Sequence, residues 1–493
     1  GTIRSERHCR LGRKRQINQS NCNKDMSCLN GFCPSFVTLE GAERRKPKPA
    51  DLDIDSLIKA VPLPALPVLD TPFNLLVTGV GGTGVVTVGQ LISMAAHLEG
   101  KGASILDFTG FAQKFGSVLS FVRIGQDPDQ IHQVRIDTGM ADAVIGCDAV
   151  VSSSPKASAT YSARTRVALN TAAMPTGDLV LKRDANLNIA GRSSLIEAVV
   201  GADNLASFDA NSASEALFGD AVFANVMMLG FAWQQGLVPV SLDALMRAVE
   251  LNNVAVDQNK RAFACGRLIA ANPAALTSHL NPKMDIAASF EDVIARRAAF
   301  LEDYQHAAWA RRYRTRMKDF RARMPADLAE DLAVKAAKSL FKLMSYKDEY
   351  EVARLHRDKA FLNSLTDRFE GDFKIVHHFA PPLLGGAKDA RGRPLKRAFG
   401  PAIGPALSAL ARFKRLRGTA LDPFGYTAER RMERGLIAWF EALMARCEQE
   451  ITPANAEVWT QVLSAPMDIR GYGPVKHEAV TRTRANVEAL LSE

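Results

Sequence analysis

Four of the seven cysteines lie within the first 33 residues, and three of these form one closely spaced group. Cys22, Cys28 and Cys33 are spaced C-x5-C-x4-C, with Gly31 between the last two and Pro34 directly after the last. Thiolates on a short loop that contains glycine can converge on one metal centre, and a proline after the final cysteine also ends cysteine runs that hold [4Fe–4S] clusters. The pattern therefore favours an iron–sulfur role, with these three cysteines as candidate iron ligands.

Two alternatives to iron remain open for this group, namely a structural zinc site and a set of thiols without a ligand. A disulfide framework is disfavoured, because no charged-then-apolar leader at the start of the sequence indicates export. A [4Fe–4S] cluster usually takes four cysteines, and twelve residues separate Cys9 from Cys22 in no recognisable register. We therefore expect the remaining ligands to lie before Gly1.

A glycine-rich turn is the second pattern with chemical meaning. Gly79, Gly81, Gly82 and Gly84 follow an apolar run and precede an amphipathic stretch, which predicts a strand, a tight turn and a helix whose N-terminus can bind a phosphate. Asp107 ends the next predicted strand 23 residues later, where a dinucleotide fold places its ribose-binding carboxylate. The turn alone is a weak signal, so an NAD-dependent dehydrogenase remains only an alternative.

Segments that differ in composition and hydrophobic pattern along the 493 residues position these groups. From Phe73, short apolar runs and glycine turns alternate with longer amphipathic stretches, which predicts βαβ units and a Rossmann-like, mostly parallel sheet. After about Pro282 only helical periodicity remains, which predicts an all-α C-terminal domain. The predicted α/β protein thus has four parts: a partial ferredoxin-like iron–sulfur segment (1–40), an extended linker (41–72), an α/β domain (73–283) and a helical domain (284–493).

The composition, 47% hydrophobic and 23% charged, is typical of a soluble globular protein, and with no leader we expect it in the cytoplasm. The longest charge-free run lies between Asp220 and Asp243. Asn225 and Pro239 interrupt it, which favours a buried helix followed by a turn over a membrane span. Cys147, Cys265 and Cys447 lie in apolar surroundings and are expected to be buried packing thiols.

The net charge of +9 is concentrated in two clusters, residues 311–323 and 412–417. Such clusters can bind nucleic acid, which keeps a nucleic-acid-binding scaffold as a second alternative. No nucleic-acid motif accompanies them, so we expect solvated helix faces that dock on an acidic neighbour. Adjacent His377 and His378 fall in a short apolar run, where satisfied histidines are expected rather than a metal pair, because neighbours on a strand point to opposite faces.

Several further runs occur in a distinctive order: GFAQKFGS after Asp107, NVMMLG, NKRAFACGR, and a tail with FKLMSYKDEYEVARL, FAPPLL and IRGYGPVKHE. With the glycine turn, the first three resemble the gamma domain of 2-oxoacid:ferredoxin oxidoreductases. The N-terminal QSNCNKDMSCLNGFCPSF and the tail resemble the ferredoxin-like segment and the C-terminal domain of the fused indolepyruvate ferredoxin oxidoreductases of bacteria. The resemblance therefore covers the chain from about residue 10 to its end.

The resemblance implies an enzyme that decarboxylates aryl 2-oxoacids on thiamine diphosphate and Mg, passes electrons through [4Fe–4S] clusters to ferredoxin and forms an acyl-coenzyme A. The sequence has no Gly-Asp-Gly of a thiamine domain, so decarboxylation is expected upstream or on another chain, and no catalytic residue is assigned. The turn at 79–84 is expected to cradle coenzyme A phosphates. A homo-oligomer is expected, with neither nucleic acid nor membrane as partner.

One loop departs from the pattern of the family. The gamma domain commonly carries an acidic residue, His-Gly and an Arg-Gly-Gly run there, whereas this chain has Asp107-Phe-Thr-Gly and then Gln113-Lys114-Phe115-Gly116. Lys114 keeps a cation where arginine is usual, but an ammonium cannot make the bidentate contacts of a guanidinium. Lys114 is therefore a candidate ligand-binding residue with altered contacts.

Overall fold

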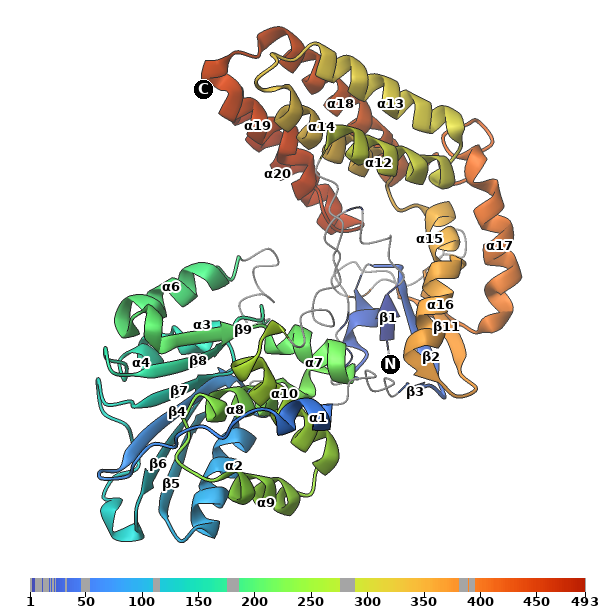
Figure 1. Ribbon diagram of the computed structural model, residues 1–493. Helices are drawn as coiled ribbons and strands as arrows, with labels where there is room; N and C mark the ends of the chain where they lie inside the picture. The colour runs from blue at the N-terminus through green and yellow to red at the C-terminus, as the bar shows by residue number, and fades with distance from the viewer. Residues whose placement is uncertain are drawn as a thin grey trace. The chain divides into compact units, whose positions relative to one another are not determined.

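The computed structural model describes residues 2–4, 24–31, 33–45, 54–109, 116–174, 186–274, 289–380 and 395–492, and the single residues Leu11, Ile17, Gln19, Cys22 and Asp389. The chain divides into two compact units, one formed by Lys46–Lys283 and the other by Gly1–Arg45 together with Met284–Glu493 (Figure 1). We call the first the α/β unit and the second the helical unit.

The α/β unit is built on a six-stranded sheet in the order β5-β6-β4-β7-β8-β9. The neighbouring strands β4, β7, β8 and β9 pair in parallel. β6 alone is antiparallel to its neighbours, β4 and β5, in this sheet. The mostly parallel sheet expected from the sequence is thus confirmed, with one antiparallel strand inserted. The strands are β4 (Phe73–Val80), β5 (Gly102–Thr109), β6 (Ser117–Gly125), β7 (Ala143–Gly146), β8 (Arg166–Asn170) and β9 (Leu205–Phe208).

Apolar side chains on both faces of this sheet are buried under helices. Successive residues of β4 alternate between faces, so that Leu75 and Val77 join one core cluster and Leu76 and Val80 join the other. The first cluster includes helices α1 (Ile54–Lys59), α2 (Val85–Leu98), α7 (Ala210–Phe218), α8 (Ala224–Gln234), α9 (Leu242–Asn252) and α10 (Val256–Ala271). The second includes α3 (Ala149–Ser152), α4 (Pro155–Ser158) and α6 (Ile189–Val200).

Helices α8 and α10 pack unusually closely, and two glycines make this possible. A Cβ on Gly230 would lie 2.0 Å from the Phe263 carbonyl oxygen, and one on Gly266 would lie 1.9 Å from the Met227 carbonyl oxygen. Residues 224–233 are buried throughout, which confirms the buried helix expected in the charge-free run. The NVMMLG and ACGR runs therefore encode one backbone-to-backbone helix contact.

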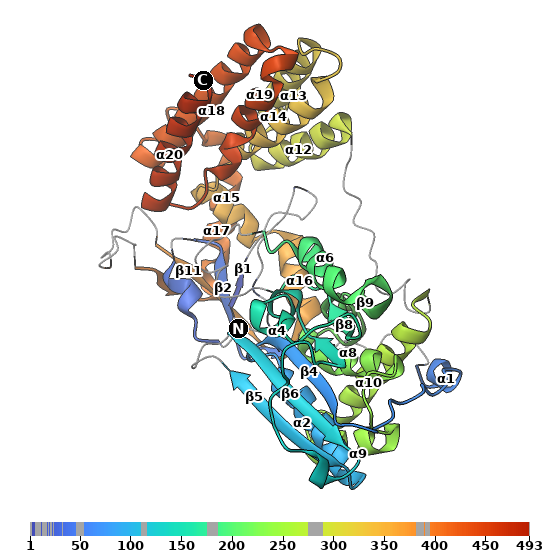
Figure 2. The same cartoon turned by 90° about the vertical axis from the view of Figure 1, so that its left-hand side faces the viewer.

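The helical unit has a core shared by six helices, drawn at the top of Figure 2. Large aromatic side chains that are almost fully buried fill it, among them Tyr304, Tyr313, Phe320, Phe440 and Trp459. The six are α12 (Phe290–Tyr304), α13 (Ala307–Ala322), α14 (Ala329–Met344), α18 (Ala428–Glu450), α19 (Ala456–Ser464) and α20 (Pro474–Leu490). Helices α15 (Glu349–His356), α16 (Lys359–Arg368) and α17 (Gly404–Arg412) complete the unit. In the described ranges no helix is both long and apolar enough to cross a membrane.

The helical unit also contains strands, so the expectation of an all-α C-terminal domain is wrong in this respect. Four strands form an antiparallel sheet: β1 (Thr2–Arg4), β2 (Phe36–Glu40), β11 (Lys374–Phe379) and β12 (Arg397–Phe399). A further pair joins β3 (Glu43–Arg44) to β10 (Phe369–Glu370). The N-terminal segment supplies β1, β2 and β3 and therefore belongs to the same unit as 284–493. The segment 41–72, expected to be extended throughout, contains β3 and α1.

Candidate functional site

The three candidate iron ligands lie on the N-terminal segment of the helical unit. Cys22, Cys28 and Cys33 are free thiols that are partly buried, and Cys28 lies in a short 3₁₀ helix. Within the described parts of the chain, no group of three or more His, Cys, Asp or Glu residues is arranged to hold a metal ion. The segment therefore offers donors of the right chemistry for iron, but the described thiols do not form a closed metal site.

Cys33 and the two residues after it are held by side chains from the C-terminal part of the chain. The Lys396 ammonium donates to the carbonyl oxygen of Cys33 at 2.6 Å. His356 Nε2 lies 3.2 Å from the carbonyl oxygen of Pro34, and Lys347 Nζ donates to Ser35 Oγ at 3.0 Å. Three consecutive residues are thus fixed by three side chains that lie more than 300 positions away in the sequence.

The hydrogen-bonded pair His356 and His377 extends this contact into the core. Burial, with repulsion from His377 and Lys347, lowers the pKa of His356 to about 3, and burial lowers that of His377 to about 4. Both imidazoles are therefore neutral at pH 7. Because the Pro34 carbonyl only accepts, His356 carries its proton on Nε2 and accepts at Nδ1 from His377 Nδ1–H, 2.9 Å away.

His378, which follows His377 on β11, has a hydrogen-bond partner of its own. His378 Nε2 lies 2.9 Å from Thr38 Oγ1 on the neighbouring strand β2. The two adjacent histidines thus make separate contacts, which confirms the expectation of satisfied histidines. The expected burial of Cys147, Cys265 and Cys447 is also confirmed.

The glycine turn of the α/β unit joins β4 to α2 as expected. Gly82 and Gly84 have φ of +82° and +94°, a backbone conformation that residues with a side chain rarely adopt. The N-cap of α2 is Gly84, which has no side chain to accept from the first N–H groups of the helix. Gly81 N donates to Gly116 O at 2.7 Å and fixes the turn to the start of β6. Such a turn can receive an anionic group.

Asn225, which the sequence analysis noted only as a polar residue in an apolar run, supports this turn from α8. Its side-chain amide donates to the carbonyl oxygen of Thr83 at 2.8 Å, and Asn225 itself is 6% exposed. Thr83 Oγ1 in turn donates to Val80 O at 2.7 Å. A polar residue at the start of an otherwise apolar helix was the signal that could have identified it.

Asp107 does not lie where the dinucleotide-fold prediction places it. It stands on β5, opposite Ser120 of β6, and Ser120 in turn stands opposite Val77 of β4. The inserted β6 therefore puts Asp107 two strand spacings, roughly 10 Å, from the strand that leads into the turn. Its carboxylate accepts a hydrogen bond from Ser120 Oγ. Lys114, the other predicted residue of this loop, lies outside the described residues.

Asp148 lies beside the base of the turn and was also not foreseen. A Cβ built on Gly79 would be 2.9 Å from Cys147 Cβ and 3.6 Å from Asp148 Oδ2, so only glycine fits there. The Asp148 carboxylate accepts from the N–H groups of Val150 and Val151 at 2.8 and 2.9 Å. Burial nevertheless raises its pKa, against the effect of these bonds. Asp148 thus caps α3 where β7 ends next to the turn.

Part of the first basic cluster is paired within the chain. Arg312 on α13 binds Glu441 at 2.8 Å, and Arg316 and Arg323 both bind Glu448 at 2.5 and 2.8 Å. Both glutamates lie on α18, so the acidic neighbour expected for this cluster is another helix of the same unit. These ion pairs leave less unpaired charge for a nucleic acid than the sequence indicates.

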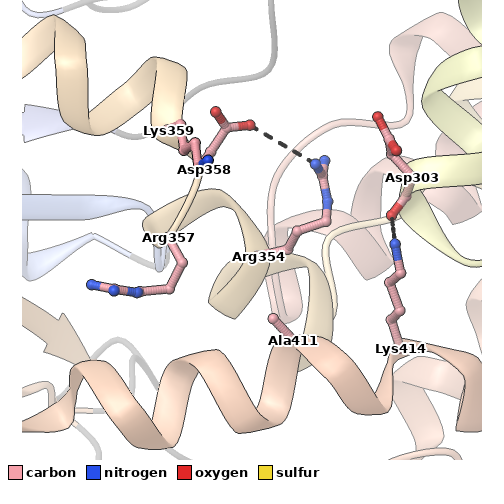
Figure 3. Close-up of a pocket in the computed structure, with 7 residues that line it drawn as sticks. All are labelled: Asp303, Arg354, Arg357, Asp358, Lys359, Ala411 and Lys414. Carbon is pink, nitrogen blue, oxygen red and sulfur yellow. Dashed lines mark hydrogen bonds and ion pairs between the residues drawn. The ribbon is translucent and has the colours of Figure 1, made fainter.

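The second basic cluster is not a uniform solvated face, as the sequence led us to expect. Arg417 points inward, is 4% exposed and donates to both carboxylate oxygens of Asp348 at 2.5 and 2.8 Å. Lys414 lines a cavity of about 490 Å³, and its ammonium donates to the backbone oxygen of Asp303 (Figure 3).

The remaining charges of this cavity also have contacts within the protein. Arg354 binds the fully buried Glu351 at 2.8 and 3.1 Å. It also lies 3.9 Å from Asp358 (Figure 3). Arg357 Nε donates to Ser408 Oγ at 3.1 Å. The charged side chains that line the cavity are therefore largely engaged in contacts between and within α15, α16 and α17. We do not assign a ligand to it.

Two family models match the chain. Residues 74–269 match the pyruvate ferredoxin/flavodoxin oxidoreductase family, and residues 290–489 match a family of unknown function, DUF6537. Among curated proteins, the indolepyruvate oxidoreductase subunit IorB of Thermococcus kodakarensis is 28% identical over 207 residues, covering 39% of this chain and 94% of that protein. The same subunit of Pyrococcus horikoshii is 26% identical over 202 residues, with the same shares covered.

Among solved structures, a pyruvate oxidoreductase subunit of Thermotoga maritima aligns with 40% of this chain and 96% of its own, at 19% identity and a TM-score of 0.30. The gamma subunit of a keto/oxoacid ferredoxin oxidoreductase from Geobacter sulfurreducens aligns with 40% of this chain and 98% of its own, at 20% identity and a TM-score of 0.29. The family model and the curated relatives thus show that residues 74–269 are similar to the pyruvate ferredoxin/flavodoxin oxidoreductase family.

Proposed function

We propose that this chain is the electron-transfer and scaffolding portion of a 2-oxoacid:ferredoxin oxidoreductase of the indolepyruvate type, acting on aryl 2-oxoacids. One observation carries the proposal: a single chain combines an α/β domain of this family with three free cysteines on a segment fixed at three consecutive residues. The relatives named as indolepyruvate oxidoreductase subunits support the substrate class.

In this proposal the two units have different tasks. Cys22, Cys28 and Cys33 contribute ligands to a [4Fe–4S] cluster, whose remaining ligands come from elsewhere, and such a cluster when bound supplies one-electron transfer toward ferredoxin. The turn at 79–84 receives phosphates of coenzyme A, because its glycines and the uncapped start of α2 present N–H groups to an anion. Thiamine diphosphate and Mg would bind another domain, since the sequence has no Gly-Asp-Gly. A homo-oligomer in the cytoplasm remains part of the proposal.

The two alternative functions receive less support from the geometry. An NAD-dependent dehydrogenase requires a ribose-binding carboxylate beside the turn, and β6 separates Asp107 from it. A nucleic-acid scaffold requires free cations, and Arg312, Arg316 and Arg323 are bound by glutamates of α18. Neither alternative is proposed further.

The ligand role is tested by measuring iron, zinc and labile sulfide on the chain after anaerobic reconstitution, with EPR of the reduced sample. Iron and sulfide with a cluster signal are expected, and Cys28→Ala should lose most of both, whereas Cys447→Ala, which removes a buried thiol of the helical core, should not. Bound zinc without iron, or equal iron in both variants, would contradict the ligand assignment.

The phosphate role of the turn is tested by calorimetry with coenzyme A and with NAD. We expect coenzyme A to bind and Asn225→Ala to weaken it, because the turn loses the hydrogen bond to Thr83 O. Binding of NAD but not of coenzyme A would instead revive the dehydrogenase. In the complete enzyme, arylpyruvate-dependent dye reduction that Cys28→Ala does not slow would remove the cluster from the electron path.

A further inference from the structure

We propose that Lys347, His356 and Lys396 are positioning residues for the cysteine segment, and that holding this segment is a function of the region that matches DUF6537. The part of this inference that concerns iron rests on the proposed function, whereas the part that concerns the segment itself does not.

The three donors reach consecutive residues from three different places in the fold. Lys347 lies just before α15, His356 is the last residue of α15, and Lys396 directly precedes β12. Their acceptors are Ser35 Oγ, Pro34 O and Cys33 O. Two of these contacts come from the two ends of α15 and the third from the start of β12, so more than one element holds the segment.

Two of the residues in these three contacts, which we call the clamp at 33–35, are fully buried. Ser35 and His356 are both 0% exposed, and His356 is oriented by His377 through the Nδ1–Nδ1 hydrogen bond. Loss of a partner in such a place leaves a buried polar group unsatisfied, which is far more costly than loss of an exposed hydrogen bond. The contact therefore determines where the segment lies and is not an incidental surface contact.

The strand that follows the clamp continues the same attachment. β2 pairs with β11 from Val37 to Glu40, and Val37 and Leu39 pack against Phe361 and Leu365 of α16 in a small apolar core. Downstream of Ser35 the chain is therefore held by a sheet and a core. The clamp at 33–35 extends this rigid attachment to Cys33 itself.

Lys396 adds a charge as well as a hydrogen bond. Its ammonium donates to the Cys33 carbonyl oxygen at 2.6 Å, which places a positive charge directly on the residue that carries one of the candidate ligands. A cluster held by thiolates becomes more negative when it is reduced, so a neighbouring cation favours the reduced form. We infer that Lys396 shifts the reduction potential of a cluster on this segment toward more positive values.

The positional part is tested on the apoprotein, without iron. The rate at which an uncharged alkylating reagent modifies Cys33 is measured by mass spectrometry on the full chain, together with hydrogen exchange of residues 33–40. His356→Ala is expected to raise the Cys33 rate at least tenfold while the melting transition of the α/β unit is unchanged. His356→Gln, whose amide can donate to Pro34 O, should restore much of the protection.

Two comparisons keep this test decisive. Lys338→Gln removes one exposed charge from α14 of the same unit and should leave the Cys33 rate at the wild-type value. If His356→Ala proves unfolded, Lys347→Ala provides the same readout through Ser35. A Cys33 rate within twofold of wild type in folded His356→Ala and Lys347→Ala proteins would overturn the clamp.

The charge part is tested by potentiometry of the reconstituted cluster. Lys396→Gln keeps a donor but removes the charge, so the potential should become more negative, whereas Lys396→Arg should stay close to wild type. An equal potential in all three proteins would overturn the electrostatic role. Failure of the wild-type chain to assemble any cluster would instead count against the proposed function, and the alkylation result would still decide the clamp.

Discussion

Removal of the Arg417 guanidinium should destabilise the helical unit by about 3–5 kcal/mol, the cost of breaking a buried ion pair by deleting one partner. Arg417 and Asp348 have side chains that are 3% and 2% exposed, so the remaining carboxylate would be left buried without its counter-ion. Arg417 also donates to Tyr304 O at 2.7 Å and stacks on the Tyr304 ring at 3.7 Å. Arg417→Ala removes all of these contacts at once.

The hydrogen bonds of Arg417 give a similar estimate of the stability that would be lost. Each hydrogen bond to a charged group contributes about 1.5–3 kcal/mol, and Arg417 makes two to Asp348, for roughly 3–6 kcal/mol in total. Asp348 also caps α15 by accepting from Glu351 N at 2.8 Å, so its displacement would loosen the helix that carries His356. We therefore expect hydrogen exchange in α15 to accelerate more than in α18.

Urea denaturation of the full chain measures this effect, with hydrogen exchange used to assign each transition to its unit, because two units need not unfold together. Arg446→Ala is the matched control, since it breaks an exposed pair with Glu450 on α18 and should cost under about 1 kcal/mol. The reasoning is refuted if Arg417→Ala costs no more than Arg446→Ala. The double variant Arg417→Leu/Asp348→Asn offers a further check. It should recover part of the free energy of unfolding that Arg417→Leu alone loses, because it no longer buries an unpaired carboxylate.

Three further predictions follow from other sites. His356 and His377, with pKa values of about 3 and about 4 beside Lys347 and Arg357, take up protons on unfolding below pH 6.5. The free energy of unfolding of the helical unit should thus be highest above that pH and fall by up to about 1.4 kcal/mol per histidine per pH unit as the pH drops toward 4. In His377→Asn the free energy of unfolding, measured by denaturation at several pH values, should fall less steeply with decreasing pH. Gly266→Ala should cost at least about 1–3 kcal/mol by overpacking, and an unchanged urea midpoint would contradict the close α8–α10 contact. Asn225→Ala should speed hydrogen exchange at residues 79–84 while the sheet stays protected.

The sequence predicts well those features that depend on neighbouring residues. The strand, glycine turn and helix from Phe73 to Leu98 follow from apolar runs and glycines in one short stretch, and the buried α8 follows from its lack of charge. In the candidate site, the local pattern also singled out the cysteine group, whose role as iron ligands stays a prediction. These predictions needed no knowledge of distant parts of the chain.

The features that the sequence did not reveal depend on distant partners. β11 is only six residues long, and its strand character becomes evident only when β2 lies beside it. Arg417 belongs to a basic run, and nothing near it shows that Asp348 will bury it. Asp107 has the spacing of a ribose ligand, but the antiparallel insertion of β6 is a property of strand order and not of spacing.

The pairing of β2 with β11 also determines the order in which the protein can assemble. The helical unit is discontinuous, and the whole α/β unit is inserted between its Arg45 and its Met284. During synthesis the cysteine segment emerges before the α/β unit, but its three anchors exist only once the chain has grown past Lys396. By then every residue of the α/β unit has been made, and domains generally fold as units from the N-terminal side. The thiols are therefore made before the whole α/β unit but are fixed in place only after it.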